Sequence, residues 1–439
     1  MRAVLLILST ALLLQANQFI VQDVNKTKKQ SSWIALPYVF SSEAMGPTLG
    51  VVGIFSGFFQ PQLTIVATAY RGSDQDVKKY SQVQENVQDE IANASGFVLG
   101  VNGYRPWFSE RLFVSFLGSY AYYPNKKLYL NGSNESQKVV DSQNPIEITP
   151  LQTQGYNNFA KLSFDYVLPV GDSKKTVLPI IEMKRGLVTN RDSKGGGTPF
   201  LTGQTLIKTE LFYTKWTVDK LTPEPSYNSN GIRISLEHDN TDYSGNPSRG
   251  YSFNTTFSVD FGIGNSTQSW NSLEADYSHY IELGDFKYLR HHVIALNTWS
   301  AYSPSWDKSE QIGLGVIDSH QTPMWEGARL GGFDRMRAYD SNRFNDKAAL
   351  YFGAEYRIIP DFNPMRDQKW SPIPIDWFQA VIFAEAGRVA PKYNATLLKD
   401  MKYDVGFSLR ALAAKVPVRF EMAFGKEGST MWVMIKQPF

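Results

Sequence analysis

The sequence predicts an all-β protein, a transmembrane antiparallel β-barrel of about 16 strands. Three observations predict this fold. Segments of alternating polarity recur along the 439 residues, aromatic side chains make up 14% of the chain, and the N-terminus has the pattern of a secretory signal. Aromatic residues are favoured both in strands and at the two interfaces of a membrane barrel. A soluble protein of two packed sheets is the competing interpretation, and the three observations together favour the barrel.

The N-terminal residues resemble an export signal. Arg2 supplies a positive charge, an apolar run extends from Val4 to Leu14, and Ala16 closes a plausible cleavage site. The alternatives are a buried helix or a membrane anchor, but the run is shorter than the roughly 20 residues that span a bilayer. We therefore expect a signal peptide over residues 1–16, a short periplasmic segment over 17–32 and a barrel domain over 33–439.

Sixteen alternating segments, separated by turn residues, are candidate strands. They cover residues 48–57, 62–70, 97–104, 111–122, 158–168, 177–185, 205–217, 232–238, 251–263, 271–283, 286–300, 348–358, 377–387, 403–411, 416–423 and 431–436.

Counting these strands from a periplasmic N-terminus gives each connection a side of the membrane. The connection 301–347 follows an odd strand, which predicts an extracellular position. Connections 71–96, 123–157 and 186–204 are predicted to be periplasmic, although such turns are usually short. Within the first of these, Val83, Val87 and Ile91 lie four apart, which fits either a short amphipathic helix or a solvated loop.

Composition argues against several classes of function. The 44 basic and 42 acidic side chains are nearly balanced, so no basic field suggests a nucleic-acid partner. The chain has no cysteine, which excludes disulfides, zinc–thiolate sites and cysteine nucleophiles. The five histidines form no His-Glu-x-x-His motif, and neither a serine nucleophile elbow nor a P-loop is present. We expect no enzyme activity, no cofactor and no metal.

The segment 348–358 and the residues before it form the most informative stretch. Side chains from Leu350 to Ile358 alternate between an apolar face and a face that carries Glu355, as expected of a strand with lipid on one side and water on the other. Before it, Gly331 and Gly332 precede the polar tip Met336-Arg337-Ala338-Tyr339. On the next strand, Glu385 and Gly387 follow Phe383.

These motifs resemble the BamA/TamA-type outer-membrane assembly barrels, the bacterial surface antigen family. In that family a Gly-Gly strand end leads to a (Val/Ile)-Arg-Gly-(Phe/Tyr) tip that folds back into the lumen, and a later strand carries Phe-x-Asp-x-Gly. Here Ala338 replaces the glycine of the tip, and Glu385 replaces the aspartate. The resemblance implies a long extracellular loop inside the barrel, with Arg337 paired to Glu385 and with Glu355 close by. The alternative is that these are ordinary polar groups facing the lumen.

Two further signatures fit the same family. The stretch 231–250 looks like its Asp-x-Arg-Asp…Pro-x-x-Gly turn, with Asp239 and Asp242 expected to bond turn amides and Pro247 and Gly250 to set the reversal. A calcium loop fits the acidic residues poorly because their spacing is not that of an EF-hand.

The end of the chain carries the third signature. Val433, Ile435 and Phe439 share one face of an alternating strand, similar to the C-terminal signal by which outer-membrane barrels are recognised. Pro438 cannot donate a ladder hydrogen bond, and the first strand is rich in glycine. A weak seam between the last and first strands is therefore expected.

The resemblance implies a monomeric barrel of the bacterial outer membrane that inserts, assembles or translocates protein or lipid. Its expected partners are outer-membrane lipid and lipopolysaccharide, client proteins or lipids, and a separate periplasmic protein in place of the periplasmic POTRA domains of the family. A passive porin-like channel or a structural barrel is the alternative.

Overall fold

The computed structural model describes residues 19–23, 31–42, 44–80, 87–129, 151–189, 195–217, 226–284, 286–311, 315–365, 375–413 and 416–439. The predicted signal peptide, most of the segment 17–32 and Val83 lie outside these ranges. No helix among the described residues is long and apolar enough to cross a membrane.

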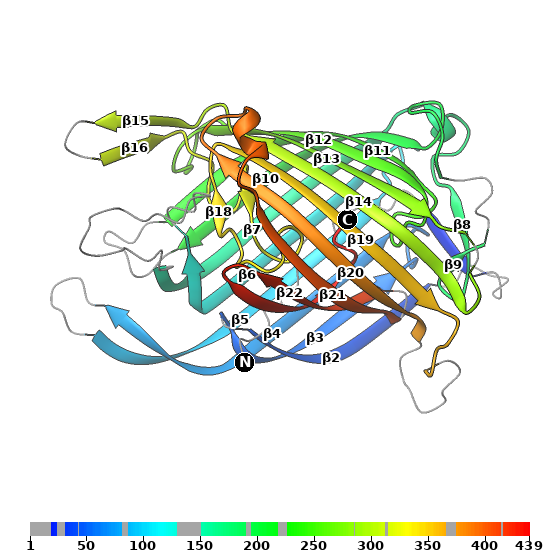
Figure 1. The fold of residues 1–439 in the computed structure, drawn as a ribbon, viewed down its shortest axis with the longest axis horizontal. Coiled ribbons are helices and arrows are strands. Elements are labelled where there is room, and N and C mark those ends of the chain that lie inside the picture. Colours follow the sequence, from blue (N-terminus) through cyan, green and yellow to red (C-terminus); the bar gives the residue numbers. More distant parts are fainter. Residues whose placement is uncertain are drawn as a thin grey trace.

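One antiparallel sheet of 16 strands forms the body of the molecule, and its strands pair in chain order (Figure 1). The strands are β2 (Ser32–Ser42), β3 (Gly46–Ser56), β4 (Thr64–Tyr80), β5 (Val87–Tyr104), β6 (Leu112–Leu128), β7 (Leu151–Val167), β10 (Gln204–Thr217), β11 (Ser226–Thr241), β12 (Gly250–Asp260), β13 (Trp270–Glu282), β14 (Leu289–Tyr302), β19 (Ala348–Pro360), β20 (Ile375–Ala390), β21 (Lys402–Ala413), β22 (Val416–Gly425) and β23 (Gly428–Ile435). The all-β fold and the number of strands are confirmed.

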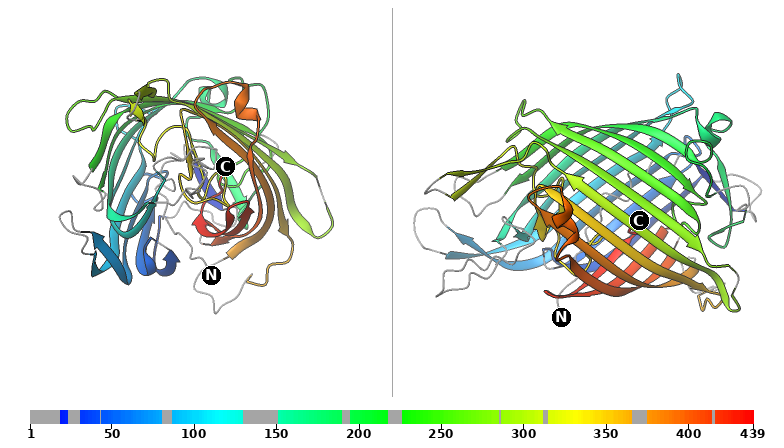
Figure 2. Two further views of the ribbon diagram at one scale, coloured as in Figure 1. Left: turned by 60° about the vertical axis from the view of Figure 1, so that its left-hand side comes forward. Right: turned by 45° about the horizontal axis from the view of Figure 1, so that its top comes forward.

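The sheet curls round a lumen without closing (Figure 2). Within the described residues, β2 and β23 form its two edges and no ladder joins them. The alternation along the strands sets the two faces. In β19, Tyr351, Glu355 and Arg357 are buried inside, while Phe352 and Ala354 are exposed outside. Exposed apolar side chains on the outer face are what a lipid environment requires.

The list of predicted strands contained two compensating errors. The segment 177–185 is wrong as a barrel strand, because β8 (Ile180–Lys184) lies in a separate three-stranded sheet with β1 (Ile20–Asp23) and β9 (Leu187–Val188). The first barrel strand is β2, which was missed. The omitted β2 and the falsely included segment 177–185 offset each other, so the predicted number of strands agrees with the structure.

The omission of β2 also placed two connections at the wrong end. The connections after β4 and after β6 follow odd-numbered strands of the sheet, so they lie at the same end as the 303–347 connection, not at the predicted periplasmic end. Val87 and Ile91 lie in neither of the two expected alternatives, a short helix or a solvated loop, because both residues belong to β5.

Chain segments from both ends fill the lumen. The connection 303–347 carries two small strand pairs. The β15–β16 hairpin (Asp307–Gln311 and Gly315–Ser319) projects beyond the end of the barrel (Figure 1), and the rest of the connection, with β17–β18 (Arg329–Leu330 and Phe344–Asn345), enters the lumen. Its yellow trace runs inside the ring of strands in Figure 2. At the other end, the β8–β9 turn reaches Trp377 on the inner face of β20, whose indole Nε1 donates to the Gly186 carbonyl at 3.1 Å.

Candidate functional site: a luminal loop held by buried ion pairs

The 303–347 connection is here called the luminal loop, and its tip is residues 336–339. Just before the tip, the loop turns tightly at two glycines. Gly331 and Gly332 have φ of +102° and +120°, where L side chains are strained. The Gly332 amide donates to the Tyr339 carbonyl at 3.0 Å and closes the turn. A Cβ on Gly331 would lie 2.3 Å from the Asp340 carbonyl oxygen. Glycine is therefore required at position 331 on both counts.

Arg337 extends from this tip into a cluster of carboxylates. Its Nη1 donates to Glu355 at 2.8 Å and to Glu421 at 3.0 Å, and its Nε donates to Glu385 at 3.1 Å. All four side chains are fully buried. The structure thus brings together the three residues that the sequence singled out and adds Glu421 from β22. Glu355 and Glu385 are diagonal neighbours on β19 and β20, because Glu385 pairs with Gly353.

The surroundings keep this guanidinium charged. Burial lowers the pKa of Arg337, but Glu385, Glu421 and Glu355 outweigh it and raise that pKa well above its ordinary value. The guanidinium carbon also lies 3.5 Å from the centre of the Phe383 ring, a cation–π contact. A buried charge that lost these partners would be strongly unfavourable, so moving the tip away from these carboxylates would cost free energy.

The backbone of the tip is hydrogen-bonded to the barrel wall, as is the Arg337 side chain. The Arg337 amide donates to Glu385 at 2.7 Å, and the Ala338 amide donates to Asp404 at 3.0 Å. The Arg337 carbonyl accepts from Trp432 at 2.7 Å and also from Thr430. With Glu355 and Glu421, these partners come from β19, β20, β21, β22 and β23. A single loop residue and its neighbour therefore connect the last five strands up to the open edge.

Two glycines on the wall give the tip its room. A Cβ on Gly387 would lie 2.8 Å from Leu330 and 3.0 Å from the Met336 sulfur, and a Cβ on Gly425 would lie 2.9 Å from the Ala338 Cβ. Only Met336 of the four tip residues has a positive φ, +55°. Ala338 therefore needs no left-handed backbone, and its methyl group fits because Gly425 lies opposite. Tyr339 is buried beside it and donates to the Tyr403 carbonyl at 3.1 Å.

Three more arginines extend the cluster. Arg410 donates to Glu355 at 2.8 Å and to Glu421 at 3.1 Å, and Arg357 donates to Glu355 at 2.8 Å. Arg419 donates to Glu421 at 2.9 Å and to the Phe333 carbonyl of the loop at 2.9 Å. These arginines share the carboxylates that bind Arg337, so Arg337 belongs to a network of ion pairs rather than to one pair.

The chain end joins the network instead of continuing the strand. After β23 the backbone turns at Lys436, whose φ is +75°. Phe439 then lies inside against Tyr280, Val293 and Ala295, and Arg357 donates to its carbonyl at 3.0 Å. The expectation that Phe439 shares the face of Val433 is wrong, because the left-handed turn ends the alternation. Ile435 remains in the ladder opposite Val418.

The predicted turn signature also meets the network. Asp239 accepts from the Thr241 amide at 2.9 Å, and Asp242 accepts from the Ser248 amide at 2.8 Å. Gly250 has φ of +94°, and Pro247 is buried in the turn between them.

Asn246 of this turn links the signature to the chain end. Its side-chain oxygen accepts from Gln437 at 3.0 Å, and Gln437 accepts from Arg410. The three signatures are therefore connected through Asn246, Gln437, Arg410 and Glu355.

Other contacts hold the rest of the luminal loop. Glu326 accepts from Arg233 on β11 at 2.8 Å, and Arg335 donates to Asp276 on β13 at 3.3 Å. Arg343 donates through two nitrogens to Glu427, in the turn between β22 and β23, at 2.7 and 2.9 Å. The loop thus contacts several sides of the lumen.

Sequence reasoning missed several residues of this site. They are Glu421, Arg410, Arg419, Asp404, Gly425, Thr430 and Trp432. Alternation along β22 places Glu421 and Arg419 on the inner face, so the sequence contains this signal. Which of the two side chains reaches Arg337 depends on the register of the strand. No group of three or more His, Asp or Glu in the described part of the chain could hold a metal ion.

A curled 16-stranded antiparallel sheet with an apolar outside and an ion-paired loop inside defines an outer-membrane β-barrel with a luminal loop. The Omp85 superfamily domain matches residues 206–430, just over half of the chain. The chain therefore belongs to the Omp85 superfamily, which confirms the predicted family.

Among solved structures, the chain is similar to CdiB from Escherichia coli, with a TM-score of 0.53 and 10% identity over 91% of this chain and 61% of CdiB. A BamA from Haemophilus ducreyi lacking POTRA domains 1-3 matches with a TM-score of 0.46 and 12% identity, over 94% of this chain and 73% of that one. The chain thus spans less than two thirds of the CdiB chain, and at this identity the likeness concerns the fold. No curated protein matches the sequence.

Proposed function

We propose that this protein is an assembly or translocation barrel of the bacterial outer membrane, which helps protein or lipid enter or cross that membrane. The observation that carries the proposal is a filled lumen beside an open sheet. Arg337 holds the luminal loop within the last five strands, while no described strand pairs with the outer edges of β2 and β23. An unpaired strand edge is a template for another strand.

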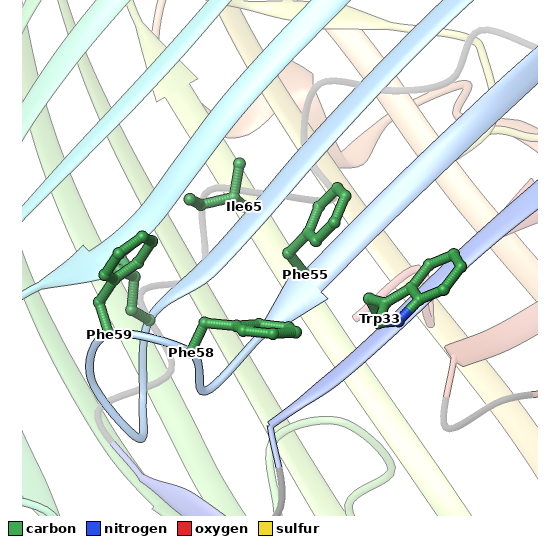
Figure 3. A pocket seen from close by; sticks show the side chains of 6 residues that line it. Trp33, Phe55, Phe58, Phe59 and Ile65 are labelled. Atoms are coloured by element: carbon green, nitrogen blue, oxygen red, sulfur yellow. The ribbon is translucent and has the colours of Figure 1, made fainter.

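The outer surface beside this edge supports the same proposal. Trp33, Phe55, Phe58, Phe59 and Ile65 surround an apolar hollow of about 680 Å³ on β2, β3 and β4 and the turn that joins β3 to β4 (Figure 3). Exposed apolar side chains next to an unpaired edge suit an incoming strand with one lipid-facing side. The client would be a protein strand or a lipid, delivered by a separate periplasmic partner.

A passive porin is the second candidate, and the filled lumen disfavours it. The luminal loop, the chain end and the β8–β9 turn all occupy the interior. A porin keeps a water-filled channel. The proposed barrel would function as a monomer and would not need a cofactor.

Client folding in vesicles tests the proposed activity. Proteoliposomes with the purified protein receive a urea-unfolded, eight-stranded outer-membrane protein, and its folding is followed by the change in gel mobility of the unheated sample. We expect faster client folding than in protein-free vesicles and in vesicles with a heat-inactivated sample. Equal folding rates in all three would argue against assembly of barrel clients.

A further inference from the structure

A hollow on the outer face, away from the open edge, has the chemistry of a lipid site. It measures about 840 Å³ and lies at the end of the barrel where the luminal loop enters. Its floor is the outward face of β13 and β14, where Leu273 pairs with Tyr302 and Ala275 pairs with Ser300. Leu273 is 46% exposed. This floor is apolar and continues the lipid-facing surface of the barrel.

The connection after β20 forms the wall of the hollow. Tyr393 packs edge-to-face on Tyr302, with ring centres 5.8 Å apart, and shares a hydrogen bond of 2.9 Å with Ser300. The short 3-10 helix η4 (Ala395–Leu398) follows, and its Leu397 is buried against Ala348 and Ala390. The wall is therefore packed against the outer face of the sheet. Two tyrosines at this level match the aromatic girdle at a membrane interface.

Two lysines also line the hollow. They are Lys347, immediately before β19, and Lys392, next to Tyr393. Among the described residues neither has a carboxylate within ion-pair distance. The exposed Asp307 also lines the hollow, so its charged groups sum to one positive charge. Arg388 lies on the same outer face, since it pairs with Leu350 on β19, but its guanidinium donates to the Lys399 carbonyl and lies 3.5 Å from Asp400, so it adds no net charge.

We propose that this hollow binds a phosphorylated acyl lipid of the outer leaflet. The acyl chain would lie on Leu273, Ala275 and Tyr302, and the phosphate would lie between Lys347 and Lys392. An apolar floor inside the membrane with a net positive charge at the interface favours an anionic phosphorylated lipid over a zwitterionic one. The site is independent of the proposed assembly activity, because it lies on the outer face of β13 and β14, away from β2 and β23.

Native mass spectrometry of the protein in a neutral detergent tests the site. The probes are bisphosphorylated lipid A, its monophosphorylated form and phosphatidylcholine, with inorganic phosphate as a competitor. We expect affinity to fall in that order of lipids. Lys347→Gln/Lys392→Gln should weaken lipid A binding about tenfold, because each basic group near an anionic surface contributes a factor of several. Lys175→Gln/Lys399→Gln, which changes two exposed lysines outside the hollow, is the matched control.

A second variant tests the acyl part. Ala275→Trp fills the floor without changing any charge, and it should weaken the binding of all forms of lipid A. Gel mobility of the unheated samples shows that each variant is folded. Equal lipid A binding by the wild type and the double lysine variant would overturn the proposal. Displacement of the lipid by millimolar inorganic phosphate, or full binding by Ala275→Trp, would overturn the assignment of an acyl lipid.

Discussion

Arg337 bonds to three buried carboxylates through one side chain, and its own backbone amide and carbonyl are bonded as well. Removing this side chain leaves the carboxylates of Glu355, Glu385 and Glu421 close together without the cation that they share. Breaking a buried pair in this way costs about 3–5 kcal/mol. We therefore expect Arg337→Ala to lower the temperature at which the folded gel band is lost, by far more than Arg335→Ala does.

Arg335 is the matched control because it lies two residues earlier in the same loop. Its ion pair with Asp276 is about one-third exposed on both sides, and pairs of this kind contribute little. Equal losses of thermal stability in the two variants would contradict a special role for the Arg337 network.

The turn before the tip gives a test of backbone strain. Gly331→Ala would place a methyl group 2.3 Å from the Asp340 carbonyl at a φ of +102°, so we expect it to destabilise the loop by roughly 1–3 kcal/mol or more. Gly264→Ala is the control, because Gly264 also has a positive φ, +66°, with no atom within 4 Å. Limited proteolysis of the loop distinguishes them: only Gly331→Ala should increase cleavage, and equal cleavage would show that the close contact is unimportant.

At the scale of elements, the luminal loop and the chain end are coupled through Arg410. This side chain binds Glu355, which also binds Arg337, and it binds Gln437 at the chain end. A double-mutant cycle of Arg337→Ala and Gln437→Ala should therefore deviate from additivity by about 0.5 kcal/mol or more in thermal stability.

Asn265→Ala replaces Gln437→Ala in the control cycle, because Asn265 is an exposed amide outside the network. This pair should be additive. Additivity in both cycles would mean that the loop and the chain end are held independently.

A disulfide tests the position of the loop tip directly. The chain has no cysteine, and the Cβ positions of residues 338 and 425 would lie 2.9 Å apart, closer than the about 3.5–4.5 Å found across a disulfide. We expect Ala338→Cys/Gly425→Cys to oxidise within the folded barrel with a small shift of the loop. Ala338→Cys/Gly264→Cys should remain reduced, and the reverse result would place the tip elsewhere.

Alternation predicted most barrel strands because a membrane barrel forces every strand to have one wet and one apolar face. The strand 348–358 and both of its faces were correct. The same pattern misled at 177–185, where Ile181 and Met183 are buried in a small separate sheet. Alternation records that one face is buried, and it does not identify the sheet that buries it. The sequence did not mark β2 as a strand because Pro37 lies within it, and proline is found in strands mainly at the edge of a sheet.

The site was only partly accessible from sequence for a related reason. Glu355 and Glu385 lie on adjacent strands near the loop, and their inward direction followed from alternation. Glu421 and Arg410 reach the same point from strands further along the sheet. Their height in the lumen depends on the register of each ladder and the curl of the sheet, neither of which a local pattern contains.

At the scale of the whole molecule, the luminal loop both fills the lumen and joins the last five strands to the open edge. Within the described residues, the only strand that pairs with β2 is β3. The C-terminal strands are tied to the loop by Arg337, Ala338 and their partners. If the proposed function is correct, we expect β2 to be the edge that pairs with an incoming strand.

Single-channel recording in planar bilayers tests the central claim, that the Arg337 network keeps the lumen filled. We expect low, flickering conductance for the wild type and for Arg335→Ala, and a sharp increase for Arg337→Ala. Adding the oxidised Ala338→Cys/Gly425→Cys disulfide to Arg337→Ala should restore the low conductance, because it holds the tip without the ion pairs. Large, steady conductance in the wild type and all variants would contradict the account and favour a porin.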